Sequence, residues 1–150
     1  MSGHGARGGA PPQRLRIRVY YEDTDFGGVV YHANYLKFME RARTEWLRGL
    51  GVDQARLRAE TGLGFVVRRM RIEFLRPAMM DDMLEVETRL EREGGASLAL
   101  AQDIRLAERA AASAEPGALL ASAEVQVACV GAQGRAARLP EALKRRLSGA

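Results

Sequence analysis

The stretch YYEDTDFGGVVYHANYLKFMERARTEWL, residues 20–47, changes its pattern part-way along. Its first part is acidic and polar and holds a Gly-Gly pair, which is typical of a loop. From about Asn34 apolar residues recur at helical spacing, and two further glycines follow where such a helix would end. The apolar positions are Tyr35, Phe38, Met39, Ala42, Trp46 and Leu50. The stretch therefore predicts a loop over 22–31 and then a core helix of about 16 residues.

Alternation of apolar and polar residues predicts five β-strands around this helix. One strand precedes the helix, at 15–21, with its apolar side chains on one face. The other strands are predicted at 65–75, 83–90, 97–106 and 119–130. One long helix against an antiparallel sheet makes an α+β domain.

Turn and loop signals separate these elements. Asp81-Asp82 and Gly94-Gly95 stand where hairpin turns are expected. The alanine-rich stretch 107–118 predicts a longer loop or a short helical excursion. Further short helices are predicted at 53–60 and 140–147.

Composition sets the domain organisation and the class of protein. The chain has 150 residues, of which 47% are hydrophobic and 28% charged, and this excludes a wholly disordered chain or a fibre. Residues 1–13 are rich in Gly and Pro and predict a disordered tail, which leaves one domain at 14–150. A single cysteine, Cys129, cannot form an internal disulfide. No apolar run is long enough for a membrane-spanning helix or typical of a secretory signal, so we expect a cytoplasmic protein.

The net charge of +4 and the high isoelectric point suit an anionic partner, although a solvated basic surface explains them equally simply. Nucleic acid is not expected as the partner, because the sequence has no helix-turn-helix, zinc knuckle or aromatic-basic strand pattern. A cofactor or ligand that bears phosphate groups is the remaining candidate for an anionic partner.

A polar cluster stands just before the core helix. Asp23, Asp25 and His32 flank the pair Gly27-Gly28. A helix N-terminus offers unpaired N–H groups that can stabilise an oxyanion, and a carboxylate beside them suits a hydrolytic site. The alternative is that the two aspartates only cap the loop or helix. Two carboxylates and a histidine can also bind a metal, but we expect none here.

This stretch closely resembles the Tol-Pal-associated (YbgC-type) acyl-CoA thioesterases, in the 4-hydroxybenzoyl-CoA thioesterase branch of the hotdog superfamily. The superfamily signature is matched by Asp25, Gly28, Val29-Val30 and Asn34-Tyr35. The resemblance continues through FVVRRMRIEFLRPAMMDDMLEVETRLE, residues 65–91, and AEVQVACV, residues 123–130. It departs from the family at Gly94-Gly95-Ala96 and in the loop at 107–118. The link of the family to the Tol-Pal envelope machinery is implied by the resemblance alone.

The resemblance implies a hotdog fold, in which a five-stranded antiparallel sheet wraps a long central helix. It implies homodimers whose sheets join edge to edge, with two sites at the interface, and dimers that pair into homotetramers. It also implies hydrolysis of acyl-CoA to a carboxylic acid and free CoA, without a metal or cofactor. The alternative is a non-catalytic module that binds acyl-CoA or acyl carrier protein. Acyl carrier protein is also a candidate partner of the enzyme.

The resemblance further assigns roles to individual residues. Asp25 is implied as the nucleophile or general base, and the His32 N–H as the donor to the thioester oxygen. The residues implied to shape the substrate site are Gly28, Val29 and Tyr31. Those that are candidates for binding coenzyme A are Arg68, Arg69, Arg89, Arg92 and Ser97. Arginine suits phosphate through its bidentate fork, but each arginine can equally be a plain surface charge.

Overall fold

A computed structural model of the protein describes residues 10–111 and 113–149. The strands are β1 (Gln13–Arg18), β2 (Gly64–Phe74), β3 (Met83–Glu93), β4 (Ser97–Glu108) and β5 (Leu119–Val130). The helices are η2 (Tyr21–Asp23, a 3-10 turn), α1 (His32–Gly49), α2 (Gln54–Thr61) and α3 (Glu141–Leu147). Most of the predicted tail, residues 1–9, lies outside the described residues, and β1 begins at Gln13.

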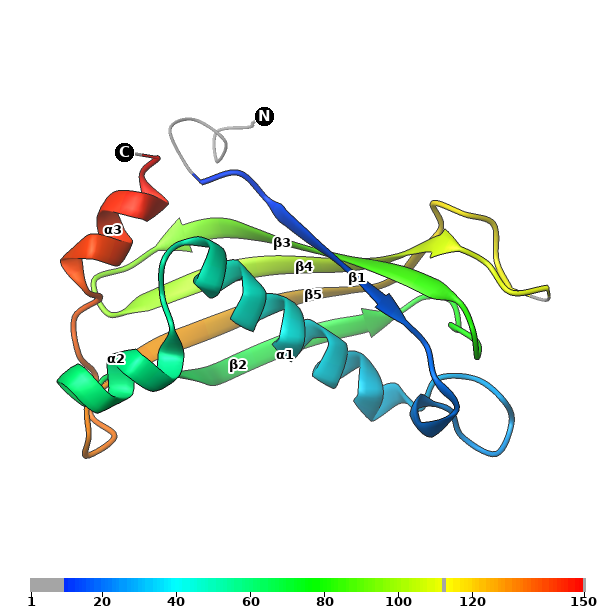
Figure 1. Cartoon of the computed structure of the whole chain (residues 1–150), viewed down its shortest axis with the longest axis horizontal. Coiled ribbons are helices and arrows are strands. Elements are labelled where there is room, and N and C mark those ends of the chain that lie inside the picture. Colours follow the sequence, from blue (N-terminus) through cyan, green and yellow to red (C-terminus); the bar gives the residue numbers. More distant parts are fainter. Residues whose placement is uncertain (1–9, 112, 150) are drawn as a thin grey trace.

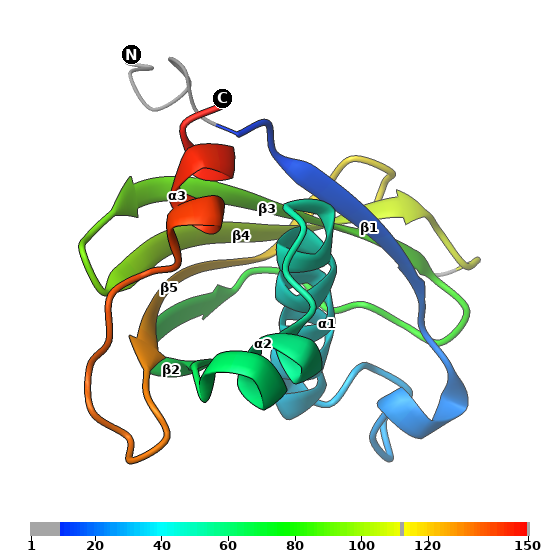
Figure 2. The same cartoon turned by 60° about the vertical axis from the view of Figure 1, so that its left-hand side comes forward.

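The five strands form one antiparallel sheet in the order β1-β3-β4-β5-β2. The sheet curves around α1, which crosses its concave face, while α2 and α3 lie toward one end (Figures 1 and 2). This arrangement confirms the predicted α+β fold, with a long central helix wrapped by a five-stranded sheet.

The core lies between α1 and the concave face of the sheet. Alternate residues of β4, such as Leu98, Leu100 and Ile104, point toward the helix and are buried. The buried side chains of α1 are Asn34, Tyr35, Phe38, Met39, Ala42, Trp46 and Leu47. Burying one large apolar side chain such as that of Phe38 contributes about 1.5–3 kcal/mol to stability. The apolar face of the helix and the apolar face of the sheet, both predicted from the sequence periodicity, therefore pack against each other in one core.

Two predictions about the chain path are wrong. Asp81-Asp82 is not a hairpin turn, because β2 and β3 lie at different places in the sheet order and do not pair with each other. The predicted strand 15–21 ends at Arg18, because the chain turns into the 3-10 helix η2 at Tyr21. The Val19 N–H still donates to the Asp82 carbonyl, at 2.9 Å.

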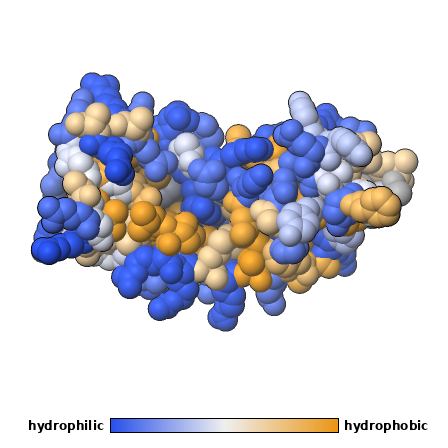
Figure 3. Space-filling model, turned by 90° about the horizontal axis from the view of Figure 1, so that it is seen from below, coloured by the Kyte–Doolittle hydropathy of each residue, from blue (hydrophilic) through white to orange (hydrophobic). Residues whose placement is uncertain are grey.

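Strand β2 is an edge strand with exposed apolar side chains. Its register against β5 shifts between Val67 and Arg69, which indicates a bulge at Arg68. The half-exposed apolar side chains on β2 and just after it are those of Val66, Val67, Phe74 and Leu75. In Figure 1, β2 is the lowest strand of the sheet. Figure 3 shows the molecule from below, and hydrophobic side chains form a band across that face. An edge of this kind leaves N–H and C=O groups unpaired.

No helix among the described residues is long and apolar enough to cross a membrane.

Candidate active site

Asp25 lies on a tight turn directly before α1. Its N–H donates to the Val29 carbonyl (2.8 Å), and the Gly28 N–H donates to the Asp25 carbonyl (3.0 Å). One carboxylate oxygen, Oδ1, accepts from the Gly27 N–H at 2.8 Å. Within residues 10–111 and 113–149, the other oxygen, Oδ2, accepts no hydrogen bond, and the side chain is exposed. The turn thus fixes the carboxylate and leaves one of its oxygens open to a substrate.

Gly28 gives this turn its shape. Its φ is +84°, in the left-handed region that other residues rarely adopt. A Cβ at this position would meet nothing within 4 Å, so the requirement for glycine is conformational rather than steric. The left-handed residue turns the chain back so that Val29 forms an antiparallel bridge with Met79. Gly28 and Val29, which are predicted to shape the substrate site, thus shape the turn through their backbone.

The N-terminus of α1 follows this turn and is uncapped. Tyr31 precedes the helix in an extended conformation, no side chain in the described part of the chain caps the terminus, and the first turn contains no acidic residue. Among the described residues, the His32 N–H donates to no backbone carbonyl, whereas the Asn34 N–H reaches the Tyr31 carbonyl (2.8 Å). Such a terminus carries a partial positive charge of about half a unit. An oxygen that gains negative charge beside it would be stabilised.

Asp23 has a structural role next to this terminus. It is buried, and its carboxylate accepts from the Tyr20 N–H and from Asn34 Nδ2, both at 2.9 Å. Its carbonyl accepts from the Tyr31 N–H at 3.0 Å. Of the two aspartates in the cluster, Asp23 therefore ties the loop to the helix, and only Asp25 presents its carboxylate outward.

We expect Asp23→Ala to lower the free energy of unfolding by about 1–3 kcal/mol, because it leaves a buried amide and a backbone N–H without an acceptor. Urea denaturation measures this change. The neighbouring Glu22 is exposed, so Glu22→Ala is the control and should leave the unfolding midpoint where it is. Equal midpoints for Asp23→Ala and the unchanged protein would show that Asp23 does not hold the loop.

Aromatic rings line the space beside this terminus. The ring centroids of Tyr31 and His32 lie 4.5 Å apart, and those of His32 and Phe74 of β2 lie 6.1 Å apart with the rings nearly perpendicular. Phe74 also contacts Tyr35 at 5.4 Å. The Tyr35 oxygen accepts from the Ala78 N–H at 2.9 Å, and burial raises the pKa of its phenol although this hydrogen bond opposes the effect. The C-terminal end of β2 therefore borders the start of α1.

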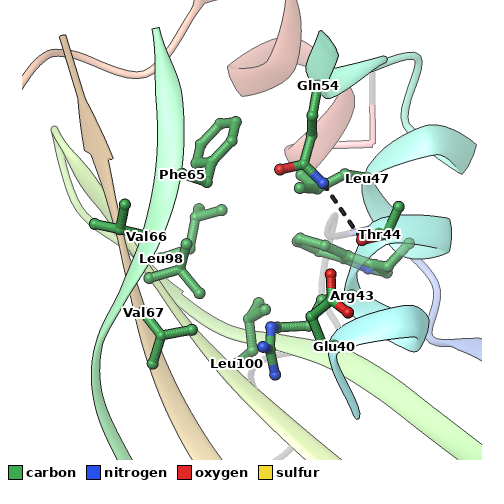
Figure 4. Close-up of a pocket in the computed structure, with 12 residues that line it drawn as sticks. Glu40, Arg43, Thr44, Leu47, Gln54, Phe65, Val66, Val67, Leu98 and Leu100 are labelled. Atoms are coloured by element: carbon green, nitrogen blue, oxygen red, sulfur yellow. Dashed lines mark hydrogen bonds between the residues drawn. The ribbon is translucent and has the colours of Figure 1, made fainter. Parts of the chain in front are cut away.

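A pocket of about 140 Å³ opens between α1 and the N-terminal half of β2 (Figure 4). The residues that line it are Glu40, Arg43, Thr44, Trp46, Leu47, Gln54, Phe65, Val66, Val67, Leu98, Leu100 and Val127. Most of these side chains are apolar, and Arg43 reaches across to donate to Gln102 Oε1 at 2.9 Å. Burial lowers the pKa of Arg43, and the nearby Glu40 carboxylate opposes this effect. Neither Asp25 nor His32 of the same chain lines this pocket.

The predicted coenzyme A residues lie in different surroundings. Arg89 is engaged by carboxylates at 2.8 Å (Glu87) and 3.0 Å (Asp103). Burial alone would lower the pKa of Arg89, but these hydrogen bonds raise it overall. Its charge is therefore largely offset, which leaves it little capacity to bind phosphate.

Arg92 is placed differently from Arg89. It lines a surface groove together with Arg69, Arg71 and the glutamates Glu91 and Glu124. None of the three arginines forms an ion pair with another described residue. Arg68 is exposed at the bulge of β2, and Ser97 begins β4. The structure thus gathers two of the predicted arginines, Arg69 and Arg92, and adds Arg71, which was not predicted.

The turn and the helix terminus together suit hydrolysis of an activated carbonyl. Asp25 can attack a carbonyl carbon or accept a proton from water, and the terminus can hold the carbonyl oxygen as it becomes negative. A family model described as the thioesterase-like superfamily matches residues 19–147 of this chain.

The chain belongs to the thioesterase-like superfamily. Over 117 residues it is 50% identical to the acyl-CoA thioester hydrolase YbgC of Escherichia coli, a match that covers 78% of this chain and 81% of the relative. Over 114 residues it is 47% identical to the acyl-CoA thioesterase YbgC of Haemophilus influenzae, with 76% and 77% covered. The crystal structure of a probable thioesterase from Bartonella henselae matches with a TM-score of 0.76 and 40% identity, over 87% of this chain and 100% of that chain.

Membership of the thioesterase-like superfamily confirms the family resemblance, the hotdog fold and the enzyme class. The protein is a thioester hydrolase, and the predicted alternative of a non-catalytic binding module is not favoured.

Proposed function

We propose that the protein hydrolyses acyl-CoA to a carboxylic acid and free CoA at the N-terminus of α1. The observation that carries this proposal is the uncapped terminus at His32, directly after the turn that presents Asp25. The two YbgC relatives, both named for acyl-CoA hydrolysis, support the substrate class.

In this mechanism the thioester oxygen accepts a hydrogen bond from the His32 N–H. Asp25 then acts in one of two ways. It attacks the carbonyl carbon, the C–S bond breaks with release of the CoA thiolate, and water hydrolyses the resulting mixed anhydride. Alternatively, Asp25 takes a proton from a water molecule, which attacks the carbonyl carbon directly. Both routes use one water and release one acid and one thiol.

A second copy of the chain completes the site in this proposal. The half-exposed apolar side chains of β2 and its unpaired backbone groups support pairing of two β2 strands across a two-fold axis. Antiparallel pairing would set the C-terminal half of one β2, which borders His32 through Phe74, against the N-terminal half of the other. That N-terminal half lines the pocket beside Arg43, so the pocket of one copy would receive the acyl group of the site on the other.

The groove with Arg69, Arg71 and Arg92 supports binding of the phosphates of coenzyme A. Two of the three arginines lie on β2, so the groove borders the edge at which the second copy would pair. Guanidinium groups free of carboxylate partners can bind phosphate in a bidentate manner. A tetramer, acyl carrier protein as a donor, a link to the Tol-Pal machinery and a cytoplasmic location stay predictions.

A thiol-release assay with purified protein over a series of acyl-CoA chain lengths tests the proposed function. We expect free CoA to appear with at least one chain length, together with an equal amount of acid. Release of no thiol from any acyl-CoA would contradict the proposal.

His32 allows the backbone donor to be tested separately from the imidazole. His32→Pro removes the imidazole and the backbone N–H, whereas His32→Ala removes the imidazole alone, so the difference between them reports on the N–H. Proline is tolerated at the first helical position, and Tyr31 already has the extended conformation that proline requires before it. We expect His32→Pro to lower kcat by about 10²–10³-fold, as for loss of one oxyanion donor. His32→Ala keeps the N–H and should cost less than either His32→Pro or Asp25→Asn. If alanine were damaging and proline harmless, the N–H would not be the donor.

A further inference from the structure

Asp82 is a fully buried carboxylate that the proposed chemistry does not use. It lies in the connection between β2 and β3, and both of its oxygens accept hydrogen bonds. Oδ2 accepts from the Met79 N–H at 2.8 Å. Oδ1 accepts from the Ala110 N–H at 2.7 Å and from the Ser113 hydroxyl. A buried carboxylate with three donors is held in one orientation.

Two of these donors come from the connection between β4 and β5, far from Asp82 in the sequence. This connection, between Glu108 and Leu119, is rich in alanine. Asp82 therefore fastens it, through Ala110 and Ser113, to the loop that precedes β3.

The same loop before β3 also holds the turn of Asp25. The Val30 N–H donates to the Ala78 carbonyl at 2.8 Å, and Val29 forms an antiparallel bridge with Met79. The Ala78 N–H in turn donates to the hydroxyl of Tyr35 on α1 at 2.9 Å. Ala78 and Met79 are thus the residues against which both the turn and the first part of α1 are aligned.

We propose that Asp82 is a positioning residue for thioester hydrolysis, with the connection between β4 and β5 as its support. Asp82 fixes Met79, Met79 fixes Val29, and the turn that ends at Val29 sets the place of Asp25 relative to the His32 N–H. This rests on the proposed role of Asp25. A displacement of about 1 Å in a reacting group can reduce a rate by about 10²-fold. A substitution of Asp82 that shifts the turn should therefore lower kcat, although Asp82 does not contact the substrate.

Ser113→Ala tests this proposal with little disturbance, because it removes one hydroxyl from outside the turn. The matched control is Ser122→Ala, which removes a hydroxyl that donates to Asp103 at 2.7 Å on the helix-free face of the sheet. We expect Ser113→Ala to lower kcat by about fivefold or more with KM and Tm nearly unchanged, and Ser122→Ala to leave kcat unchanged. Ser113→Thr, which restores a hydroxyl, should recover most of the rate.

A second variant, Asp82→Asn, should lower kcat further. Asparagine replaces one carboxylate oxygen with an NH2 group, which cannot accept a hydrogen bond from the N–H group that the oxygen bound. The proposal is overturned if kcat is unchanged in both Ser113→Ala and Asp82→Asn. It is also overturned if Ser122→Ala lowers kcat as much as Ser113→Ala does. A fall in kcat that is fully explained by a smaller folded fraction, with a lower Tm, overturns it as well. Asp25→Asn in the same assay separates the two claims. An active Asp25→Asn refutes the role of Asp25, whereas an inactive one beside fully active Ser113→Ala and Asp82→Asn refutes only the positioning by Asp82.

Discussion

A mixture of Asp25→Asn and Arg92→Glu proteins, each nearly inactive alone, is expected to recover about a quarter of the wild-type activity once the subunits exchange. If two copies build each site, a mixed dimer contains one site with both residues intact and one with neither. The expected recovery follows because about half of the dimers are then mixed and each has one working site. Arg92 suits this test because it forms no ion pair with another described residue and shares its groove with two arginines from the edge strand β2.

The control places both substitutions on one chain and mixes that chain with wild type. Shared sites predict about a quarter of the wild-type activity, because only wild-type dimers work, whereas sites within one chain predict about half. Native mass spectrometry establishes that subunits exchange, and thiol release measures activity. Exchange without recovery in the first mixture would refute a shared site that uses Arg92.

Sequence periodicity predicts most of this fold because its elements are strongly patterned. The spacing of Phe38, Met39 and Trp46 places α1 correctly, although the helix begins two residues earlier than expected, at His32. The predicted strand 119–130 matches β5 in full. Each of these elements carries its signal within its own residues, so no knowledge of its partners is needed.

The errors arise where the structure depends on distant partners. Asp81-Asp82 has the composition of a hairpin turn, but the order of strands in the sheet decides whether two consecutive strands pair. The register of β3 against β4 places Asp103 beside Arg89 and so occupies that arginine. No local pattern reveals such pairings.

The candidate site shows the same division. Asp25, Gly28 and His32 are close in sequence, and one turn and one helix start bring them together. Phe74 joins them only because β2 folds back beside α1. The role of Asp82 depends on loops that are remote in sequence, so it was not predictable from sequence spacing.

Asp25→Asn is expected to abolish most hydrolysis while it preserves the turn. The amide oxygen of asparagine can still accept from the Gly27 N–H, so the local geometry and the unfolding midpoint should persist. Asparagine is neither a nucleophile nor a base under these conditions. Loss of general-base assistance alone lowers rates by about 10²–10⁴-fold, and loss of a nucleophile costs at least as much.

The most direct measurement compares Asp25→Asn with wild type in one experiment, with thiol release from saturating acyl-CoA as the rate and binding of a non-hydrolysable thioether analogue as the control. We expect the analogue to bind both proteins with nearly equal affinity, while thiol release by Asp25→Asn falls by at least about 10²-fold. Thiol release within about threefold of wild type, with binding intact, would contradict the assignment of hydrolysis to Asp25.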